Sequence, residues 1–403
     1  MKFRFLFNYP NENIQPENWN SWSWQLRHSL KTKIQYNDFF LQKNLPLQPD
    51  EVKAFDQGEK IFQIRTTPYY AQLVKSLNDP IRKIIMPAEQ ELVLENTSQA
   101  QHMLDPLGEK KNQTAPRIIH RYSDRALFLV TDFCSVYCRY CTRKHFTAQD
   151  EVFPNKIDYE ASLNYLRKKT GIREVILSGG DPLTLSNEQI DRVLFDLRKI
   201  EHIEIIRIGT RMPVVCPMRI DEGLLKIIKK NKPVFMMTHF NHPRELTEQA
   251  AMALENTVDH GIPVMNQMVL LNGVNNHAAI VQALSRRLLY LRVKPYYMFQ
   301  CDPSEGTNHL RTSIDESESI QRELWGHLSG LAMPNLSVDI PNGGGKAYLT
   351  PKFETFKSEF KRSYQGWDGV KADYINPSVA QSMLPSDYED YAKEWLEIKN
   401  SKY

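Results

Sequence analysis

Length, composition and charge already exclude several classes of protein. The chain has 403 residues, with 51 Lys and Arg against 48 Asp and Glu, a net charge of +3 and a hydrophobic content of 41%. Binding of nucleic acid by bulk charge is therefore not expected, and the composition is that of a globular protein with a sizeable core. The start of the chain lacks an apolar run long enough for a signal peptide, and charges interrupt every later apolar stretch. We expect a cytoplasmic protein that has no membrane partner.

The N-terminal part of the chain, residues 1 to about 96, is predicted to be helical and aromatic. Its closely spaced tryptophans are expected to pack in the core or at an interface, and they are Trp19, Trp22 and Trp24. Thr67-Pro68 is a typical helix start. The polar, proline-bounded segment from Asn96 to Pro116 is the expected linker. The first unit of the chain is therefore predicted over residues 1–116.

From about Ala126, short β-rich runs alternate with amphipathic helical segments, a pattern typical of a parallel sheet wrapped by helices. Most strands recur at intervals of about thirty residues, the length of one βα unit. The segment Asn187 to Ile200 is a predicted helix with its apolar residues on one face. The predicted strands are Ala126–Val130, Glu174–Ser178, Ile203–Thr210, Val234–Phe240, Ile262–Leu271, Lys294–Asp302 and Leu336–Pro341.

A barrel and a doubly wound open sheet both fit this alternation. The two differ in where polar residues gather, and six strands carry one at or just past the C-terminal end: Ser178, Arg211, His239, Gln267, Asp302 and Asp339. Side chains from six strands that converge on one rim favour a barrel, whose active site lies at that rim. We therefore predict an α/β fold with a partial (β/α)6 TIM-like barrel over residues 117–349. A short C-terminal extension, residues 350–403, follows without an assigned function.

The first βα connection is the longest and carries the sequence CSVYCRYC, which spaces Cys134, Cys138 and Cys141 as CxxxCxxC. Three thiolates on one loop suit an iron–sulfur cluster. A closed zinc site is the alternative, but it needs a fourth ligand, for which His145 is the only nearby candidate. A cluster held by three thiolates leaves one iron open to a small molecule, which is a catalytic feature.

This cysteine spacing after the first barrel strand resembles the radical S-adenosylmethionine (SAM) superfamily. The resemblance implies a 4Fe-4S cluster on the three cysteines. After the second strand, the run Ser178, Gly179, Gly180 and Asp181 resembles the glycine-rich motif that contacts the methionine amino group of SAM in this superfamily. Two glycines after a strand would by themselves indicate only a tight turn.

The resemblance narrows to the lysine 2,3-aminomutase family and extends from about Asn18 to Leu349. The stretches that carry it include TPYYAQL, HRYSDRALFLVTDFCSVYCRYCTRKHF, ILSGGDPL, RIGTRMPVV, THFNHP, NQMVLLNGVN, PYYMFQCDPSEGTNHLRT and VDIPNGGGK. In the last of these, Lys346 resembles the lysine to which the family attaches pyridoxal 5'-phosphate (PLP). A lysine amine can form a Schiff base with this cofactor. A flexible loop with an exposed lysine is the alternative, which the neighbouring Asp339 disfavours.

Further residues gain roles from the resemblance alone. Arg121 and Arg125 match the family's candidates for the PLP phosphate, with Tyr122 near the ring. Arginine binds phosphate through two N–H groups, although both could also be rim arginines paired with Asp124. His239 and Gln267 resemble residues that line the SAM and PLP pockets. His239 could equally be a satisfied polar residue at a strand end.

The resemblance also predicts how the substrate is bound. Arg143 corresponds to the anchor for the substrate carboxylate, and Asp302 and Asp339 match the pair that receives the distal amine of lysine. Two neighbouring anions require a cation, so a substrate with a side-chain carboxylate would be repelled. The alternative for Asp302 is a turn cap before Pro303.

Two departures from the family pattern stand out. No cysteine follows Lys346, whereas familiar clostridial members carry there a cysteine group that helps to bind a structural zinc, so we predict none here. Asn342 also replaces a glycine that is common in the family, at the edge of the expected substrate pocket.

The resemblance implies a PLP- and SAM-dependent radical aminomutase that moves the α-amino group of L-lysine from C2 to C3. The same chemistry on another amino acid such as arginine, or on lysine destined for modification of elongation factor P, is one alternative. A non-catalytic iron–sulfur or PLP-binding regulator is another. The expected partners are a small amino acid, a flavodoxin- or ferredoxin-like one-electron donor, and further copies of the chain.

Overall fold

The computed structural model describes residues 18–58, 62–97, 100–144, 147, 152–376, 385 and 387–400. In this part of the chain, one sheet contains ten strands in the order β1 to β10, and a second sheet contains β11, β12 and β13. Strands β3 to β9 are parallel, whereas β1, β2 and β10 pair antiparallel at the two edges. No helix in the described ranges is both long and apolar enough to cross a membrane.

The seven parallel strands coincide with the seven predicted ones. They are β3 (Arg125–Thr131), β4 (Glu174–Gly179), β5 (Ile205–Gly209), β6 (Val234–Thr238), β7 (Val264–Leu270), β8 (Lys294–Gln300) and β9 (Asn335–Ile340). The helices between them are α6 (Lys156–Lys168), α7 (Asn187–Arg198), α9 (Glu222–Lys230), α10 (Glu248–Asp259), α11 (Ala278–Tyr290) and α12 (Ile314–Leu324). Six βα units followed by a seventh strand confirm the partial (β/α)6 barrel.

The local sequence explains where these helices begin. In each of the six, the residue before the first turn accepts a hydrogen bond from a backbone N–H of that turn, which satisfies a donor that the helix itself cannot. These caps are Asn155, Ser186, Asp221, Thr247, His277 and Ser313. The apolar face predicted for the segment from Asn187 is buried through Ile190, Val193, Leu194 and Leu197.

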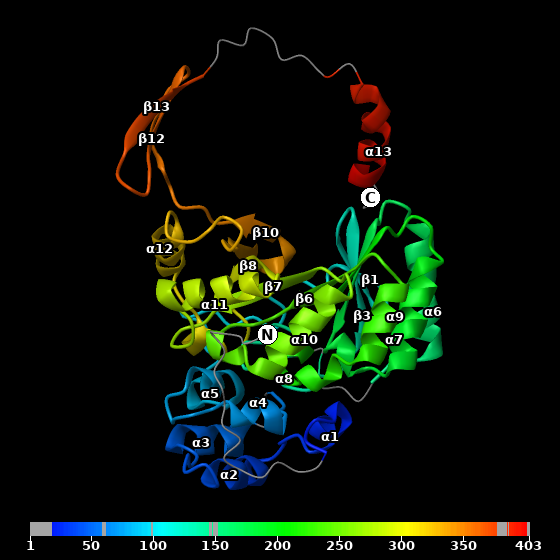
Figure 1. Ribbon diagram of the computed structural model, residues 1–403, viewed down its shortest axis with the longest axis vertical. Coiled ribbons are helices and arrows are strands. Elements are labelled where there is room, and N and C mark those ends of the chain that lie inside the picture. The colour runs from blue at the N-terminus through cyan, green and yellow to red at the C-terminus, as the bar shows by residue number, and fades with distance from the viewer. Residues whose placement is uncertain are drawn as a thin grey trace.

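The N-terminal residues form short helices that pack together on one end of the barrel (Figure 1). They are α1 (Trp22–Arg27), α2 (Lys33–Leu41), α3 (Pro49–Gly58), α4 (Pro68–Gln72) and α5 (Pro80–Ile85), followed by the 3-10 turn η1 (Glu89–Leu92). The predicted start at Thr67-Pro68 is confirmed, because the Thr67 side chain caps α4. Trp19 is buried, and Trp22 and Trp24 pack against the core.

Contacts between these helices and the barrel are extensive. Tyr69 Oη lies 2.5 Å from Thr247 Oγ1, the Thr67 hydroxyl donates to the carbonyl of Val215 at 2.6 Å, and Arg244 forms a 2.7 Å ion pair with Asp79. The boundary at residue 116 stays a prediction, since buried residues from both sides of it belong to one hydrophobic cluster.

The C-terminal extension contains structure that the sequence did not predict. Strands β11 (Glu354–Lys357), β12 (Lys361–Gln365) and β13 (Lys371–Ile375) form an antiparallel sheet, and α13 (Tyr388–Asn400) follows. The sheet lies at the edge of the molecule near α12 (Figure 1), where Trp367 in the β12–β13 turn packs against His327, and it exposes several large apolar side chains. β11 and β13 are exposed on both faces and β12 is mostly half-buried, so the strands lack the alternation of buried and exposed residues by which a strand is recognised.

Candidate active site

A cavity of about 570 Å³ opens inside the barrel. Its size lies in the range of ordinary ligand pockets. All six polar residues that were predicted to meet at the rim line it, and so do most of the residues assigned by resemblance: Arg121, Tyr122, Arg125, Cys138, Cys141, Arg143 and Lys346. Cys134, Gly179, Gly180 and Asp181 are not among its lining residues.

The cysteine loop follows β3, and the glycine-rich motif after β4 holds it by backbone contacts. The N–H of Gly180 donates to Thr131 O at 2.7 Å, and that of Asp181 donates to Phe133 O at 2.8 Å. A Cβ on Gly180 would lie 2.2 Å from Phe133 O, and one on Gly179 would lie 2.0 Å from Thr131 O. Only glycine therefore fits at either position, and the motif fixes the backbone that leads into Cys134.

The three thiols are near enough to influence one another's pKa, and two of them accept hydrogen bonds. Burial and the neighbouring thiols raise the pKa of Cys141 to about 11, and the pKa of Cys134 is also raised. A buried group of thiolates requires a bound cation. Arg211 Nη1 donates to Cys138 Sγ at 2.8 Å, and the backbone N–H of Arg143 donates to Cys141 Sγ at 3.3 Å. These features fit a cluster whose sulfur ligands accept hydrogen bonds.

The zinc alternative gains no ligand from the structure. His145 lies outside the described residues, and within the described ranges no three or more His, Cys, Asp and Glu side chains are grouped for one metal ion. A 4Fe-4S cluster does not require such a group, because each thiolate binds a different iron.

Asp181 faces the protein interior. Its carboxylate accepts hydrogen bonds from Thr210 Oγ1 at 2.6 Å, from the backbone N–H of Arg211 at 2.7 Å and from that of Leu183 at 3.0 Å. The structure thus gives Asp181 the role of joining the ends of β4 and β5. Its assignment to the amino group of SAM stays a prediction.

His239 lines the cavity and has a buried ring nitrogen without a partner. Among the described residues its Nε2 has no hydrogen-bond partner, while its ring stacks on Tyr140 with 5.6 Å between the ring centres. Burial and the charge of Arg211 lower the pKa of His239 to about 3, so the ring is neutral. A buried polar atom without a partner usually awaits a ligand. This orphaned nitrogen fits a bound SAM or PLP molecule, and Gln267 on β7 lines the same cavity.

Lys346 lies on β10 (Gly345–Tyr348), beside Asp339 on β9. Its Nζ is 3.4 Å from the Asp339 carboxylate, and its backbone N–H donates to Tyr122 Oη at 3.1 Å. The predicted neighbourhood of Lys346 and Asp339 is therefore confirmed. Asn342, in the preceding loop, has φ of 62°. Asparagine tolerates this left-handed conformation, so the loop keeps a backbone suited to the family's glycine.

Two arginines flank the Tyr122 ring, one at 4.0 Å (Arg125) and one at 5.0 Å (Arg121) from its centre. Arg125 pairs with Asp124 at 2.6 Å, as the alternative interpretation expected, whereas Arg121 pairs with Asp339 at 3.3 Å. Both guanidinium groups nevertheless line the cavity. An aromatic ring close to two guanidinium groups fits a cofactor that has a planar ring and a phosphate.

Asp302 follows β8, and its carboxylate is buried close to that of Asp339. Burial and the nearby charge of Asp339 raise its pKa to about 7. The turn at Pro303 uses the main-chain oxygen of Asp302, which accepts from Ser304 N at 2.8 Å and Thr307 Oγ1 at 2.9 Å. Asp339 has two cations at 3.3 to 3.4 Å, but no cation in the described ranges comes within 4.0 Å of Asp302. Its carboxylate is therefore open to a positively charged ligand.

Arg143 joins the cysteine loop to two other segments. Its Nε and Nη2 donate to the Glu109 carboxylate at 2.9 and 2.7 Å, and its Nη1 donates to Ser178 Oγ at 2.8 Å. Glu109 lies just before β1 (Gln113–Ala115), in a segment that crosses the lysine loop so closely that a Cβ on Gly108 would lie 2.9 Å from Gly343.

Several residues that line the cavity were not predicted from the sequence. They are Glu109, Tyr140, Arg207, Tyr296, Tyr297, Phe299 and Tyr348. Arg207 lies inside the stretch RIGTRMPVV, and Tyr296 and Tyr297 lie inside PYYMFQCD, so the family resemblance of these stretches could have identified them. Glu109 lies in the segment that was expected to be a linker, and no sequence pattern marks it.

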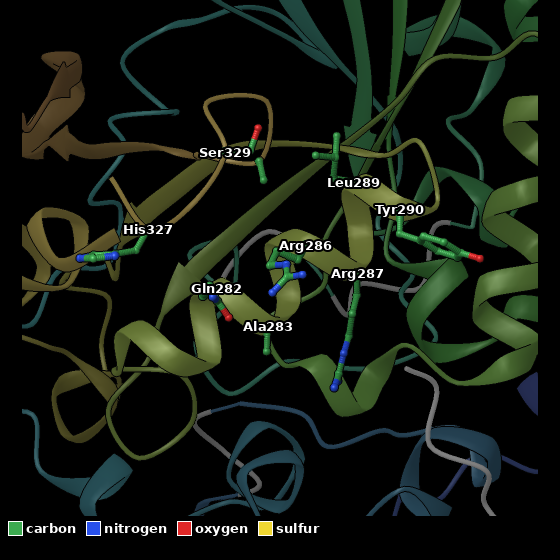
Figure 2. Close-up of a pocket in the computed structure, with 9 residues that line it drawn as sticks. Gln282, Ala283, Arg286, Arg287, Leu289, Tyr290, His327 and Ser329 are labelled. Atoms are coloured by element: carbon green, nitrogen blue, oxygen red, sulfur yellow. The ribbon is translucent and has the colours of Figure 1, made fainter. Parts of the chain in front are cut away.

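A second cavity of about 520 Å³ lies beside α11, and none of the predicted site residues is among the residues that line it. Its labelled side chains come from α11 and from the segment after α12, and they spread around the helix, with His327 and Tyr290 at opposite sides (Figure 2). The side chains do not converge on one point, so we assign no ligand to it.

A partial barrel with three cysteines after its first parallel strand is the arrangement of a radical SAM enzyme. Residues 128–282 match the family model described as "Radical SAM superfamily", and residues 321–403 match the model described as "Lysine-2,3-aminomutase". Membership in the radical SAM superfamily implies a 4Fe-4S cluster, SAM, a small-molecule substrate and a one-electron donor.

Curated relatives narrow the family. The chain is 40% identical over 370 residues to L-lysine 2,3-aminomutase of Clostridium subterminale, covering 91% of this chain and 86% of that protein. It is 38% identical over 371 residues to the enzyme of the same name from Methanococcus maripaludis, covering 91% and 84%. Glutamate 2,3-aminomutase of Clostridioides difficile is 36% identical over 355 residues, covering 88% and 82%. The chain belongs to the lysine 2,3-aminomutase family and is a radical SAM aminomutase, an isomerase, which excludes the non-catalytic alternative.

Proposed function

We propose that the protein converts L-lysine to β-lysine by moving the α-amino group from C2 to C3, with PLP carried on Lys346. When bound, the cluster with SAM supplies a carbon radical, and PLP holds the migrating amine. Cys134, Cys138 and Cys141 would hold the cluster, while Ser178, Gly179, Gly180, Asp181, His239 and Gln267 would surround SAM and the PLP ring. Arg121 and Arg125 would bind the phosphate.

The observation that carries the choice of substrate is the state of Asp302. Its carboxylate is buried beside Asp339 and has no partner cation in the described ranges, so an ammonium group at that position relieves the repulsion. Arg143 offers a guanidinium at the cysteine loop for the α-carboxylate. A substrate that fits these groups has a cationic side chain at one end and a carboxylate at the other, as lysine has.

One of the relatives is a glutamate 2,3-aminomutase, so a substrate with a negatively charged side chain has to be considered as well. A side-chain carboxylate would meet Asp302 and Asp339, two like charges, and binding would be opposed. Arginine satisfies the same pair through its guanidinium, so it stays the second candidate. A flavodoxin- or ferredoxin-like electron donor is part of the proposal, and a homo-oligomer, a cytoplasmic location and the lack of a structural zinc stay predictions.

The test is a product assay under anaerobic conditions with the full chain, reconstituted iron and sulfide, SAM, PLP and a reductant. Lysine should give β-lysine, and arginine and glutamate in parallel reactions identify any other substrate. No product from any α-amino acid would contradict the proposal.

Attachment of PLP is tested separately. Borohydride should fix the cofactor on Lys346 in the wild-type chain, and mass spectrometry of peptides should locate it there. The variant Lys346→Ala should lose the adduct, while Lys352→Ala, which changes an exposed lysine nearby, should keep it.

A further inference from the structure

Arg211 connects the cysteine loop to the N-terminal helices. It lies just past β5, and its Nη1 donates to Cys138 Sγ at 2.8 Å. Its Nη2 donates to Tyr70 Oη and to Glu245 Oε1, both at 2.7 Å, and its Nε donates to His239 O at 3.3 Å. In the part of the chain that the structure describes, Arg211 is the one guanidinium that donates to a sulfur of the CxxxCxxC motif.

The partners of Arg211 are themselves fixed. Glu245, in the 3-10 turn η4 (Pro243–Glu245), is fully buried, and its Oε2 accepts from the backbone N–H groups of Asn241 and His242 at 2.6 and 3.0 Å. Tyr70, on α4, is also buried and donates to Glu245. The guanidinium therefore has one orientation, in which it directs an N–H group at the thiol. Tyr70 lies in the stretch TPYYAQL and Arg211 in RIGTRMPVV, while Glu245 lies two residues after THFNHP.

We propose that Arg211 is a positioning residue that raises the reduction potential of the cluster by donating a hydrogen bond to the thiolate of Cys138. The proposal rests on the function proposed above, since it requires a cluster on the three cysteines. In the step concerned, one electron passes from the external one-electron donor to the oxidised cluster. No bond forms or breaks, no proton moves, and the negative charge of the cluster rises by one.

The sign of the effect follows from charge. A buried positive group close to the sulfur stabilises the more negative, reduced cluster, and hydrogen bonds to cluster sulfurs act in the same direction. Glu245 opposes this effect, because its carboxylate offsets the charge of Arg211 at 2.7 Å. Removal of Arg211 and removal of the charge of Glu245 should therefore shift the potential in opposite directions. Damage to the fold would not produce that pair of results.

The experiment is a redox titration of the reconstituted full chain without SAM, followed by the electron paramagnetic resonance signal of the reduced cluster. Arg211→Gln should lower the potential, so that the ratio of reduced to oxidised cluster at a fixed solution potential falls about tenfold, which for one electron is about 59 mV. Arg211→Lys keeps the charge and should lower it less. Glu245→Gln should raise it.

Arg244→Gln is the matched control. Arg244 is the neighbour of Glu245 and also binds the N-terminal helices, through Asp79 at 2.7 Å and Leu73 O at 2.6 Å, and no hydrogen bond from it to a cysteine is found among the described residues. The reduction potential of the cluster in Arg244→Gln should equal that in the wild-type chain.

The outcomes separate the two proposals. A wild-type chain that binds no iron contradicts the proposed function, whereas an assembled cluster with the same potential in all variants overturns only the role of Arg211. Shifts of one sign in both Arg211→Gln and Glu245→Gln also overturn it. If Arg211→Gln assembles no cluster, Arg211→Lys and Glu245→Gln decide, and an upward shift in Glu245→Gln together with a downward one in Arg211→Lys supports the proposal.

Discussion

Glu109 occupies the two-donor edge of the Arg143 guanidinium, through contacts of 2.7 and 2.9 Å. Its side chain is only 5% exposed, so the pair is screened little by water. A guanidinium binds a carboxylate best through two parallel N–H groups, and here those groups already have an anion. If Arg143 binds the substrate carboxylate, Glu109 competes with it.

The first prediction concerns this competition. Glu109→Gln removes the resident charge while it keeps the size of the side chain, so the KM for lysine should fall several-fold at unchanged kcat. Steady-state kinetics of the reconstituted enzyme measure both constants. A raised KM would mean instead that Glu109 orients Arg143 for the substrate.

The second prediction concerns Asp302. Asp302→Asn removes the open anion that is expected to bind the distal ammonium, and loss of a desolvated charge partner costs about 2 to 5 kcal/mol. The KM for lysine should rise accordingly. The control Asp315→Asn changes an exposed carboxylate in the first turn of α12 and should leave the constant unaltered. Equal KM values in the two variants would remove Asp302 from the substrate site.

The third prediction concerns pH and needs no cofactor. The pKa of Asp302 is about 7 in the folded chain, above the usual range for aspartate of about 4. A raised pKa means that the folded state resists deprotonation, so the stability that the neutral carboxyl permits is lost as the pH rises through 7. Chemical denaturation should show Asp302→Asn gaining stability relative to the wild-type chain between pH 5 and pH 8. A constant difference would show that neither burial nor the charge of Asp339 raises the pKa of Asp302 in the folded chain.

The fourth prediction concerns the glycine-rich motif. Gly180→Ala places a Cβ 2.2 Å from Phe133 O, so the backbone before Cys134 must shift, at a cost of about 1 to 3 kcal/mol. Iron content after reconstitution should fall. Gly330→Ala introduces the same methyl group where nothing lies within 4 Å, and this variant should bind iron normally. Full iron content in both would show that the motif does not hold the cysteine loop.

Much of the barrel could be predicted because its signals are local. Each parallel strand is a short β-rich run, and the polar residues at the strand ends reach one cavity because parallel strands all point the same way. The placement of Lys346 beside Asp339 follows from the hairpin of β9 and β10, in which these two residues are direct partners.

The remaining features depend on contacts between distant segments. Glu109 meets Arg143 across 34 positions, and Arg211 meets Cys138 across 73. No periodicity encodes such pairs, because they form only when the barrel brings the loops together. The sheet of β11 to β13 was missed for a different reason. Its outer strands have water on both faces and its middle strand is mostly half-buried, so no alternation of buried and exposed residues marks them.

The docking of α4 and α5 on the barrel has a consequence for how such proteins can be recombined. Tyr70 completes the surroundings of Arg211, Glu91 pairs with Arg139 inside the cysteine motif, and Asp79 pairs with Arg244. A chimaera that grafts the N-terminal helices of a distant relative onto this barrel would take the Tyr70 hydroxyl away from Arg211 and the carboxylate partners away from Arg139 and Arg244. The two parts should therefore be inherited and engineered as a single unit.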